Sequence, residues 1–471
     1  MSERLSLKTK AIYGSGTIAF GVKDQGFAIL LMLFYNQVVG LRADLVGAAI
    51  MIAMIVDAVI DPLLGQYSDD FRSRWGRRHP FMYAAIVPVA VSYFFLWNPP
   101  AWSNEALFAY LVVTAILVRI SISLYEIPST ALLAEFSNDY DERTKLVAWR
   151  YFFGVLGGLV MMILTFNVFF APTPAYQAGQ LNPDGYWIYA LVAAGVMALA
   201  MLVSALGTHR RIASIRLPPV ERRATIGETL RHMGAVLFHP TYLSVILLSL
   251  FASMSSGLNA SLGIYFTTFF WELTASQIAD LTSSALIGIL LAFAVALPLS
   301  SRLGKKKAAA ILLSIALIVG TAPLLSRLAG IAPANGDAAL LPMLMGMLIV
   351  FTMATIGASI LAVSMIADIT EQIRLSTGKR AEGLLFSVAT MISKAVSGMG
   401  VFVSGMLLTT VAFPAGALPG QVPQETLDSL ATIYIALTVG LSLVAIVCLS
   451  FYPITREGHA DALRRLGNGD A

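Results

Sequence analysis

The chain has 471 residues, of which 57% are hydrophobic and 12% are charged, and its formal net charge at pH 7 is +4. The charged fraction is about half that of an average soluble domain, which excludes water as the solvent for most of the surface. The lone cysteine, Cys448, excludes an internal disulfide framework.

Apolar runs of membrane-spanning length recur along the whole chain. About 20 residues at 1.5 Å per residue cross ~30 Å of hydrocarbon. Twelve such runs are centred near Leu30, Ile55, Val89, Ile116, Leu156, Val196, Leu248, Ile287, Ile315, Leu348, Val401 and Leu441. The sequence therefore predicts an all-α membrane protein with 12 transmembrane helices. The first run contains Lys23 and Asp24, which favours a retained helix over a cleaved signal peptide.

Lys and Arg are distributed unequally between the predicted loops. If the N-terminus is cytoplasmic, 25 of them lie in loops and tails on that side, against Arg42 and Arg327 on the other. The positive-inside rule then predicts a multi-pass protein of the cell inner membrane with both termini in the cytoplasm. This topology accounts for the net charge, so no nucleic-acid partner is expected.

The chain is predicted to divide into two six-helix halves, residues 1–206 and 241–455, with a cytoplasmic linker at 207–240 and a cytoplasmic tail at 456–471. Two short sequence motifs are repeated between the halves. Ser73-Arg-Trp-Gly-Arg-Arg78 resembles Ser301-Arg-Leu-Gly-Lys-Lys306, and Ala134-Glu135 resembles Ala367-Asp368. Repeated halves are typical of secondary transporters that hold substrate near the membrane midplane.

The stretch from Gly65 to Arg78 is the most specific short motif. Its spacing of glycines, an acid and several cations resembles the signature loop after the second helix of the major facilitator superfamily. A plain topogenic charge cluster is the alternative, but it leaves the glycine and acid spacing unexplained. The residues that carry the pattern, predicted to serve in gating, are Gly65, Asp69, Arg74, Gly76, Arg77 and Arg78. Further glycines at 154, 157 and 158 are interpreted as sites of close helix packing.

Charged residues inside apolar helices cost at least ~2.5 to 3.5 kcal/mol each on insertion, so they are candidate functional residues. Asp57 and Asp61 are four residues apart and share a helical face, where they would repel each other unless a cation binds. This spacing predicts a coupling site for a proton or a metal cation. Arg119 shares a face with Ser123 and Glu126. We predict that Arg119 pairs with Glu126; a purely structural salt-bridge network is the alternative.

At these residues the chain resembles the glycoside-pentoside-hexuronide:cation symporters, the family of the melibiose permease, and more loosely the sodium-dependent lysophosphatidylcholine symporters. The matching stretches are residues 21–24, 56–62, 72–80, 125–128, 149–153, 365–368 and 387–394. The resemblance implies a cation site at Asp57, Asp61, Ser123 and Glu126. It implies a substrate site at Lys23, Asp24, Glu126 and Arg150, with Lys394 reaching in to neutralise the carboxylates. We add Arg119 to the substrate site as a donor to hydroxyl groups.

Three positions depart from the melibiose permease pattern. Ile60 stands where that permease has an amide, and it offers no oxygen to a metal ion, which favours a proton over sodium. Thr130 stands where that permease has a tryptophan four residues after the helix-four acid, and Ser359 lies near the position of its helix-ten tryptophan. A galactoside ring would lose those stacking surfaces, so melibiose itself is not expected as the substrate.

We therefore predict a secondary active symporter for a sugar or glycoside-like polar solute, working by alternating access. The alternative is a cation-coupled carrier of an amphiphile such as a lysophospholipid. An enzyme is not expected, because no nucleophile, metal cluster or soluble domain is evident. All five histidines fall in predicted loops or tails, which excludes a zinc site within the membrane. No cofactor and no metal beyond a sodium ion are expected; the partners are a small-molecule substrate and membrane lipids, and the protein is expected to be a monomer.

Overall fold

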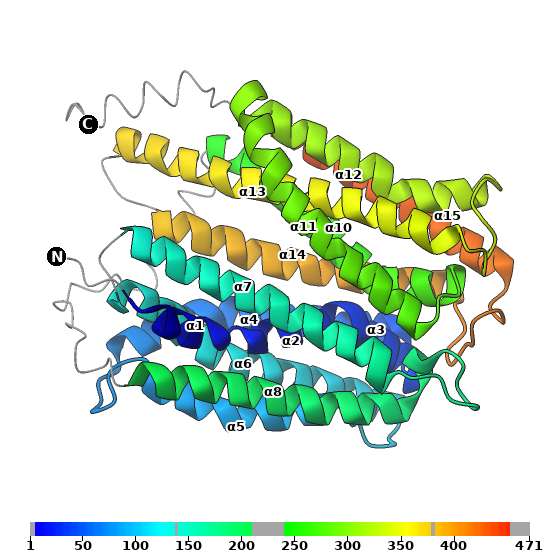
Figure 1. The fold of residues 1–471 in the computed structure, drawn as a ribbon, viewed down its shortest axis with the longest axis horizontal. Helices are drawn as coiled ribbons and strands as arrows, with labels where there is room; N and C mark the ends of the chain where they lie inside the picture. The colour runs from blue at the N-terminus through cyan, green and yellow to red at the C-terminus, as the bar shows by residue number, and fades with distance from the viewer. Residues whose placement is uncertain (1–4, 137–139, 210–239, 378–381, 453–471) are drawn as a thin grey trace. The chain divides into compact units, whose positions relative to one another are not determined.

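The structure is a computed structural model that describes residues 5–136, 140–209, 240–377 and 382–452 (Figure 1). Within these residues, 12 helices are long and apolar enough to cross a membrane, which confirms the prediction from the apolar runs. The predicted cytoplasmic tail, and nearly all of the predicted linker, lie outside the described residues.

The first membrane span is a chain of short helical segments rather than one regular helix. Ser6 caps its start, because its side chain accepts a hydrogen bond from the Thr9 N–H. The segments are α1 (Leu7–Ser15), α2 (Ile18–Gln25), η1 (Gly26–Leu30), α3 (Leu31–Leu33) and η2 (Phe34–Val38). Both η1 and η2 are π-helical, so each contains wider turns than an α-helix.

The other spans are longer helices, two of which also end in π-helical segments, η3 and η6. Their bounds are α4 (Ala43–Asp70), α5 (His79–Leu96), α6 (Asn104–Phe136), α7 (Tyr140–Leu164) with η3 (Thr165–Phe169), α8 (Pro183–His209), α10 (Pro240–Tyr265) with η6 (Phe266–Phe270), α11 (Ala275–Leu303), α12 (Lys305–Leu328), α13 (Leu340–Thr377), α14 (Glu382–Thr410) and α15 (Gln424–Ser450). A short 3-10 helix, η4 (Gly179–Leu181), precedes α8.

The chain forms two compact units. Unit 1 comprises Met1–Val220, Asn259–Thr282 and Val401–Val422; unit 2 comprises Glu221–Leu258, Ser283–Gly400 and Pro423–Ala471. In unit 1, α4 and α5 pack on α6, and α5 also packs on α8, as Figure 1 shows. In unit 2, α12 packs on α13 and α15 around buried side chains that include Leu312, Ala354 and Met365.

Glycines allow α2 and α7 of unit 1 to approach closely. A Cβ atom on Gly21 would lie 1.9 Å from the Gly154 carbonyl oxygen, and one on Gly158 would lie 2.7 Å from the Gly21 oxygen. A Cβ atom on Gly157 would lie 2.8 Å from Ile18. Larger residues would push the two helices apart, so the close-packing interpretation of Gly157 and Gly158 is confirmed, while Gly154 contributes its backbone.

An uncharged polar cluster in unit 1 connects η2 to later segments of the chain. The Tyr265 hydroxyl donates to Asn36 Oδ1 at 2.9 Å. The Gln37 amide donates to the Pro414 carbonyl at 3.2 Å and accepts from the Ala417 N–H at 3.0 Å. These hydrogen bonds satisfy amide groups that are buried, so the cluster fixes the end of the first span.

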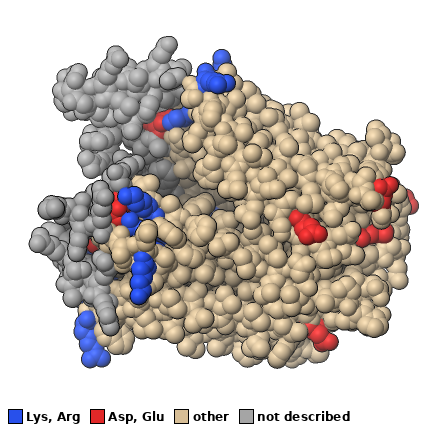
Figure 2. Space-filling view, viewed as in Figure 1, with Lys and Arg blue, Asp and Glu red and all other residues tan. Residues whose placement is uncertain are grey.

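The outward surfaces of the spans are apolar. Exposed large hydrophobic side chains on α4 and α5 include Val59, Leu63, Val87 and Val91. On the face shown in Figure 2, Lys and Arg gather toward one side and most of the remaining surface is uncharged. Apolar side chains exposed in this number require a lipid surrounding rather than water.

Candidate functional site

The two carboxylates of α4 meet one hydroxyl group of α6. Ser123 Oγ lies 3.0 Å from Asp57 Oδ1 and 2.6 Å from Asp61 Oδ1. Asp57 and Ser123 are buried, and Asp61 is partly buried. The structure therefore brings together three of the four residues of the predicted cation site on the interface between α4 and α6.

Arg119 completes this cluster. Its Nη1 donates to Asp57 Oδ2 at 3.0 Å, and its guanidinium carbon lies 4.9 Å from the centre of the Phe27 ring. The sequence predicted Glu126 as the partner of Arg119, whereas the ion pair seen here joins it to Asp57. Spacing along one helix could not reveal this pair, because the acid belongs to the neighbouring helix.

Two predicted substrate residues in the middle of the first span pair with each other. Lys23 Nζ lies 2.5 Å from Asp24 Oδ1. The Lys23 side chain is buried, whereas the Asp24 side chain is 66% exposed. The aspartate is thus reachable from outside the packed helices while its positive partner stays inside, an arrangement that can present a carboxylate to a polar solute.

Arg150 on α7 is held by two hydroxyl groups of α6. Its guanidinium donates to Ser129 Oγ at 3.2 Å and to Thr130 Oγ1 at 2.8 Å. It also lies over the rings of Tyr13 and Phe20, at 5.3 and 5.8 Å from their centres. Thr130, which stands where the melibiose permease has a tryptophan, therefore binds a predicted substrate residue instead of offering a stacking surface.

Two further predicted site residues, Glu126 and Lys394, lie on different helices. Glu126 is a partly buried residue of α6, and its carbonyl accepts hydrogen bonds from Ser129 and Thr130. Lys394 is a partly buried residue of α14 in unit 2. Their roles in binding stay predictions.

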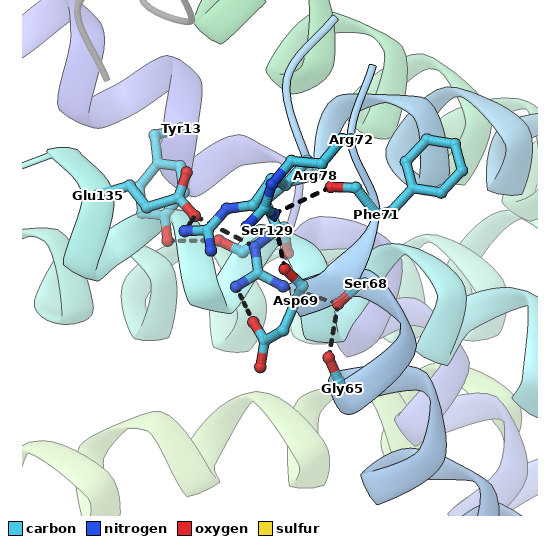
Figure 3. Close-up of polar contacts among 10 residues, drawn as sticks. Tyr13, Gly65, Ser68, Asp69, Phe71, Arg72, Arg78, Ser129 and Glu135 are labelled. Atoms are coloured by element: carbon cyan, nitrogen blue, oxygen red, sulfur yellow. Dashed lines mark hydrogen bonds and ion pairs between the residues drawn. The ribbon is translucent and has the colours of Figure 1, made fainter. Parts of the chain in front are cut away.

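The signature loop forms a charge network that connects α4 and the loop before α5 to α6 (Figure 3). Glu135 Oε1 accepts from Arg77 Nη2 at 2.6 Å and from Arg78 Nε at 3.2 Å. Arg78 also donates to Ser68 Oγ at 2.7 Å and pairs with Asp69. We call these five residues the unit 1 charge network.

The remaining residues of the signature loop lie outside this network. The Gly65 carbonyl accepts a hydrogen bond from Ser68, Gly76 has a positive φ of 76°, and the Arg74 guanidinium lies over the Trp75 ring.

Unit 2 contains a matching but smaller arrangement. Lys305 Nζ lies 2.6 and 2.7 Å from the two carboxylate oxygens of Asp368. The Tyr452 hydroxyl donates to Asp368 Oδ2 at 3.2 Å. We call Lys305, Asp368 and Tyr452 the unit 2 charge network. The sequence echo between the halves thus corresponds to equivalent acid–base pairs.

The histidines differ from the prediction that all of them lie in loops or tails. His79 is the first residue of α5 and His209 is the last residue of α8. His79 is 1% exposed, and its Nε2 lies 3.0 Å from Thr208 Oγ1. Among the described residues, no group of three or more His, Cys, Asp or Glu is placed to hold a metal ion.

Known proteins match this chain over nearly its whole length. The sequence family described as MFS/sugar transport protein matches residues 12–456. The chain belongs to this family. The isoprimeverose transporter of Lactiplantibacillus pentosus is 25% identical over 90% of this transporter and 84% of that protein. A protein of Synechocystis sp. named as a symporter is 27% identical over 99% of this transporter and 97% of its own length.

The fold is also that of solved transporters. The crystal structure of a D-xylose-proton symporter superposes with a TM-score of 0.65 at 15% identity, covering 95% of this transporter and 98% of that chain. The chain is therefore a 12-helix major facilitator superfamily transporter of the glycoside:cation symporter kind, a multi-pass membrane protein and not an enzyme.

Three contacts of this transporter were not predicted from the sequence. They are the stacking of Phe27 on Arg119, the two arginines on Glu135, and the ion pair of buried Lys10 with Glu142 at 2.7 Å. The similarity between Ala134-Glu135 and Ala367-Asp368 could have indicated the contact of the arginines with Glu135. The other two join residues far apart in sequence without any repeated motif.

Proposed function

We propose that this transporter is a symporter that moves a sugar or glycoside-like polar solute together with a coupling cation, with a proton favoured over sodium. It works by alternating access, and both termini face the cytoplasm. The observation that carries the proposal is the cluster of Asp57, Asp61 and Ser123 between α4 and α6. Two acidic groups sharing one hydroxyl, beside a fixed cation, form a site that can gain or lose one positive charge.

The solute is proposed to bind near Lys23, Asp24, Glu126 and Arg150. Charged groups and hydroxyls of this kind hydrogen-bond to sugar hydroxyls, and Asp24 is exposed enough to be reached. The name of the Lactiplantibacillus pentosus relative supports a sugar as the solute class. By the resemblance to the melibiose permease, Thr130 takes the place of a tryptophan and Ser359 lies near that of another, which supports a solute bound by hydrogen bonds rather than by stacking.

The direct test is uptake by proteoliposomes of a panel of glycosides, hexuronides and lysolipids, with pH and sodium gradients imposed separately. We expect one or more glycosides to accumulate when the pH gradient is imposed. Asp57→Asn and Asp61→Asn should each abolish accumulation while exchange of solute across the membrane persists. Accumulation of lysolipids alone would favour the amphiphile carrier and overturn the sugar proposal.

Two further measurements test the finer parts of the proposal. Lys394→Ala should lose accumulation, because the interior acids would lack a counter-charge; normal uptake would remove Lys394 from the site. Reporter fusions at both ends should be active only in the cytoplasm, as the unequal distribution of 25 and two basic residues predicts. A terminus found outside would overturn the topology.

A further inference from the structure

Arg119 is fixed on both sides within the packed helices of unit 1. It is 6% exposed, its Nη1 donates to Asp57, and its guanidinium lies against the Phe27 ring. A guanidinium stays protonated in proteins, so the positive charge at this position is permanent. Asp57 is 3% exposed, and it therefore has a built-in counter-cation within the membrane.

The oxygens of Asp57 are already engaged by this arrangement. Oδ2 accepts from Arg119 and Oδ1 accepts from Ser123, each at 3.0 Å. A metal ion needs several oxygens to converge on it, and a cation placed at Asp57 would lie beside the guanidinium charge. Ile60, on the same helix as the two aspartates, adds no oxygen.

Ser123 places the two carboxyl groups beside a single hydroxyl group. A hydroxyl group has a single hydrogen, yet Ser123 Oγ is within hydrogen-bond distance of both Asp57 and Asp61. The two carboxyl groups therefore compete for this one hydroxyl hydrogen, and a proton added to either of them would end the competition.

The neighbouring helices carry other charges that bear on this cluster. They are Lys23 and Asp24 on α2, Glu126 on α6 and Arg150 on α7. Lys23 pairs with Asp24, and Arg150 is bound to two hydroxyls of α6. The ion pair that involves Asp57 is the one with Arg119.

We propose that Arg119 determines the choice of coupling ion: its guanidinium is the permanent counter-cation of Asp57, in the position that a sodium ion would take, and it leaves a proton as the cation that the site exchanges. This inference rests on the proposed role of Asp57 and Asp61 as the coupling site. It moves Arg119 from the substrate site to the cation site. It also predicts that removing the guanidinium opens Asp57 to sodium.

The test measures sodium binding without any transported solute. Purified wild type, Arg119→Gln, Arg119→Lys and the double variant Asp57→Asn/Arg119→Gln are unfolded by heat in sodium chloride and in choline chloride at equal ionic strength. Sodium should not shift the unfolding midpoint of the wild type. It should raise that of Arg119→Gln by roughly 2 °C or more, because a bound ligand stabilises the folded state.

The other two variants serve as controls. Arg119→Lys keeps the positive charge, and the double variant removes the carboxylate that sodium would occupy, so neither should respond to sodium. The proposal is overturned if sodium stabilises the wild type as much as Arg119→Gln, or if folded Arg119→Gln gains no response. If Arg119→Gln does not fold, the wild type decides, since a sodium-specific shift there contradicts the proposal and its absence supports it.

A transport measurement separates this inference from the proposed function. In proteoliposomes, Arg119→Gln should gain uptake stimulated by a sodium gradient, which the wild type lacks. If no glycoside accumulates in any variant, the proposed solute is wrong, while the sodium shifts measured without solute still decide the role of Arg119.

Discussion

The charge networks of unit 1 and unit 2 occupy equivalent places in the sequence repeat but differ in depth. In unit 1, Glu135 holds two arginines, and all three side chains are at most 10% exposed. In unit 2, Asp368 holds Lys305, whose side chain is 32% exposed. The loop also differs, since residues 71–78 join α4 to α5 whereas Gly304 alone joins α11 to α12.

This difference shows what the repeat preserves. Gly76 and Gly304 both adopt a positive φ, 76° and 81°, and both precede the base that binds the acid. Glycine is the residue that adopts this conformation at little cost. The turn and the acid–base pair are therefore common to both units, while burial and the number of partners are not. Variants that remove the same group from each network should separate these contributions.

Glu135→Gln should have the largest effect. It removes the carboxylate that two nearly buried guanidinium groups share, and Arg78 alone keeps a second one, Asp69; breaking a buried ion pair costs about 3 to 5 kcal/mol. The apparent free energy of unfolding in mild detergent, from a denaturant titration, measures the loss. Glu105→Gln, at an exposed acid on the same helix, is the control and should change this value by less than about 0.5 kcal/mol. Equal losses in the two variants would contradict the assignment.

Arg78→Lys should have the next largest effect, about 2 kcal/mol. The guanidinium divides its donors among Glu135, Ser68 and Asp69, and an ammonium group cannot reproduce this planar geometry. The same titration measures the loss. Arg74→Lys in the same loop, at an exposed residue, should be close to neutral. A neutral result for Arg78→Lys would mean that charge alone holds the network together.

Asp368→Asn should cost less than Glu135→Gln, about 1 to 2 kcal/mol. Lys305 is partly exposed and can turn its ammonium group toward water when its partner is removed. Asp280→Asn, at an exposed acid on α11, serves as the reference. A loss as large as that of Glu135→Gln would show that exposure does not set the difference between the networks.

Tyr452→Phe should have the smallest effect at neutral pH, about 0.5 to 1 kcal/mol for one hydrogen bond. Burial, and then the charge of Asp368, raise the pKa of the Tyr452 hydroxyl above its ordinary value. A raised folded-state pKa contributes stability that is complete below about pH 10, the unfolded value, and is lost as the pH rises further. Wild type should therefore lose stability above about pH 10 more steeply than Tyr452→Phe. Parallel pH profiles would contradict this.

The helices and the repeat could be predicted from the sequence because each leaves a local pattern. Apolar runs give the 12 spans directly, and the repeated motifs mark Glu135 and Asp368 as equivalent positions, although their basic partners were not predicted. The structure also brings together Asp57, Asp61 and Ser123 of the predicted cation site, whose role stays a prediction. Ser123 was assigned to this site from the resemblance to the symporter family, because the spacing of residues within α4 cannot identify a residue of α6.

Contacts between helices could not be predicted in the same way. The partner of Arg119 lies on α4, and only the packing of α4 on α6 selects it over Glu126. His79 was assigned to the loop after the second apolar run, but it is the first residue of α5 and packs against Thr208. In both cases tertiary packing decided what local pattern left open.

The π-helical segments of the first span change how its residues are displayed around the helix axis. Hydrogen bonds in these segments skip one residue more than in an α-helix, and each extra residue turns the following part by roughly 100°. A helical wheel drawn through Leu7–Val38 therefore misplaces every side chain beyond Gly26, and again beyond Phe34. Cysteine accessibility scanned along this span should follow a 3.6-residue rhythm that slips at both points.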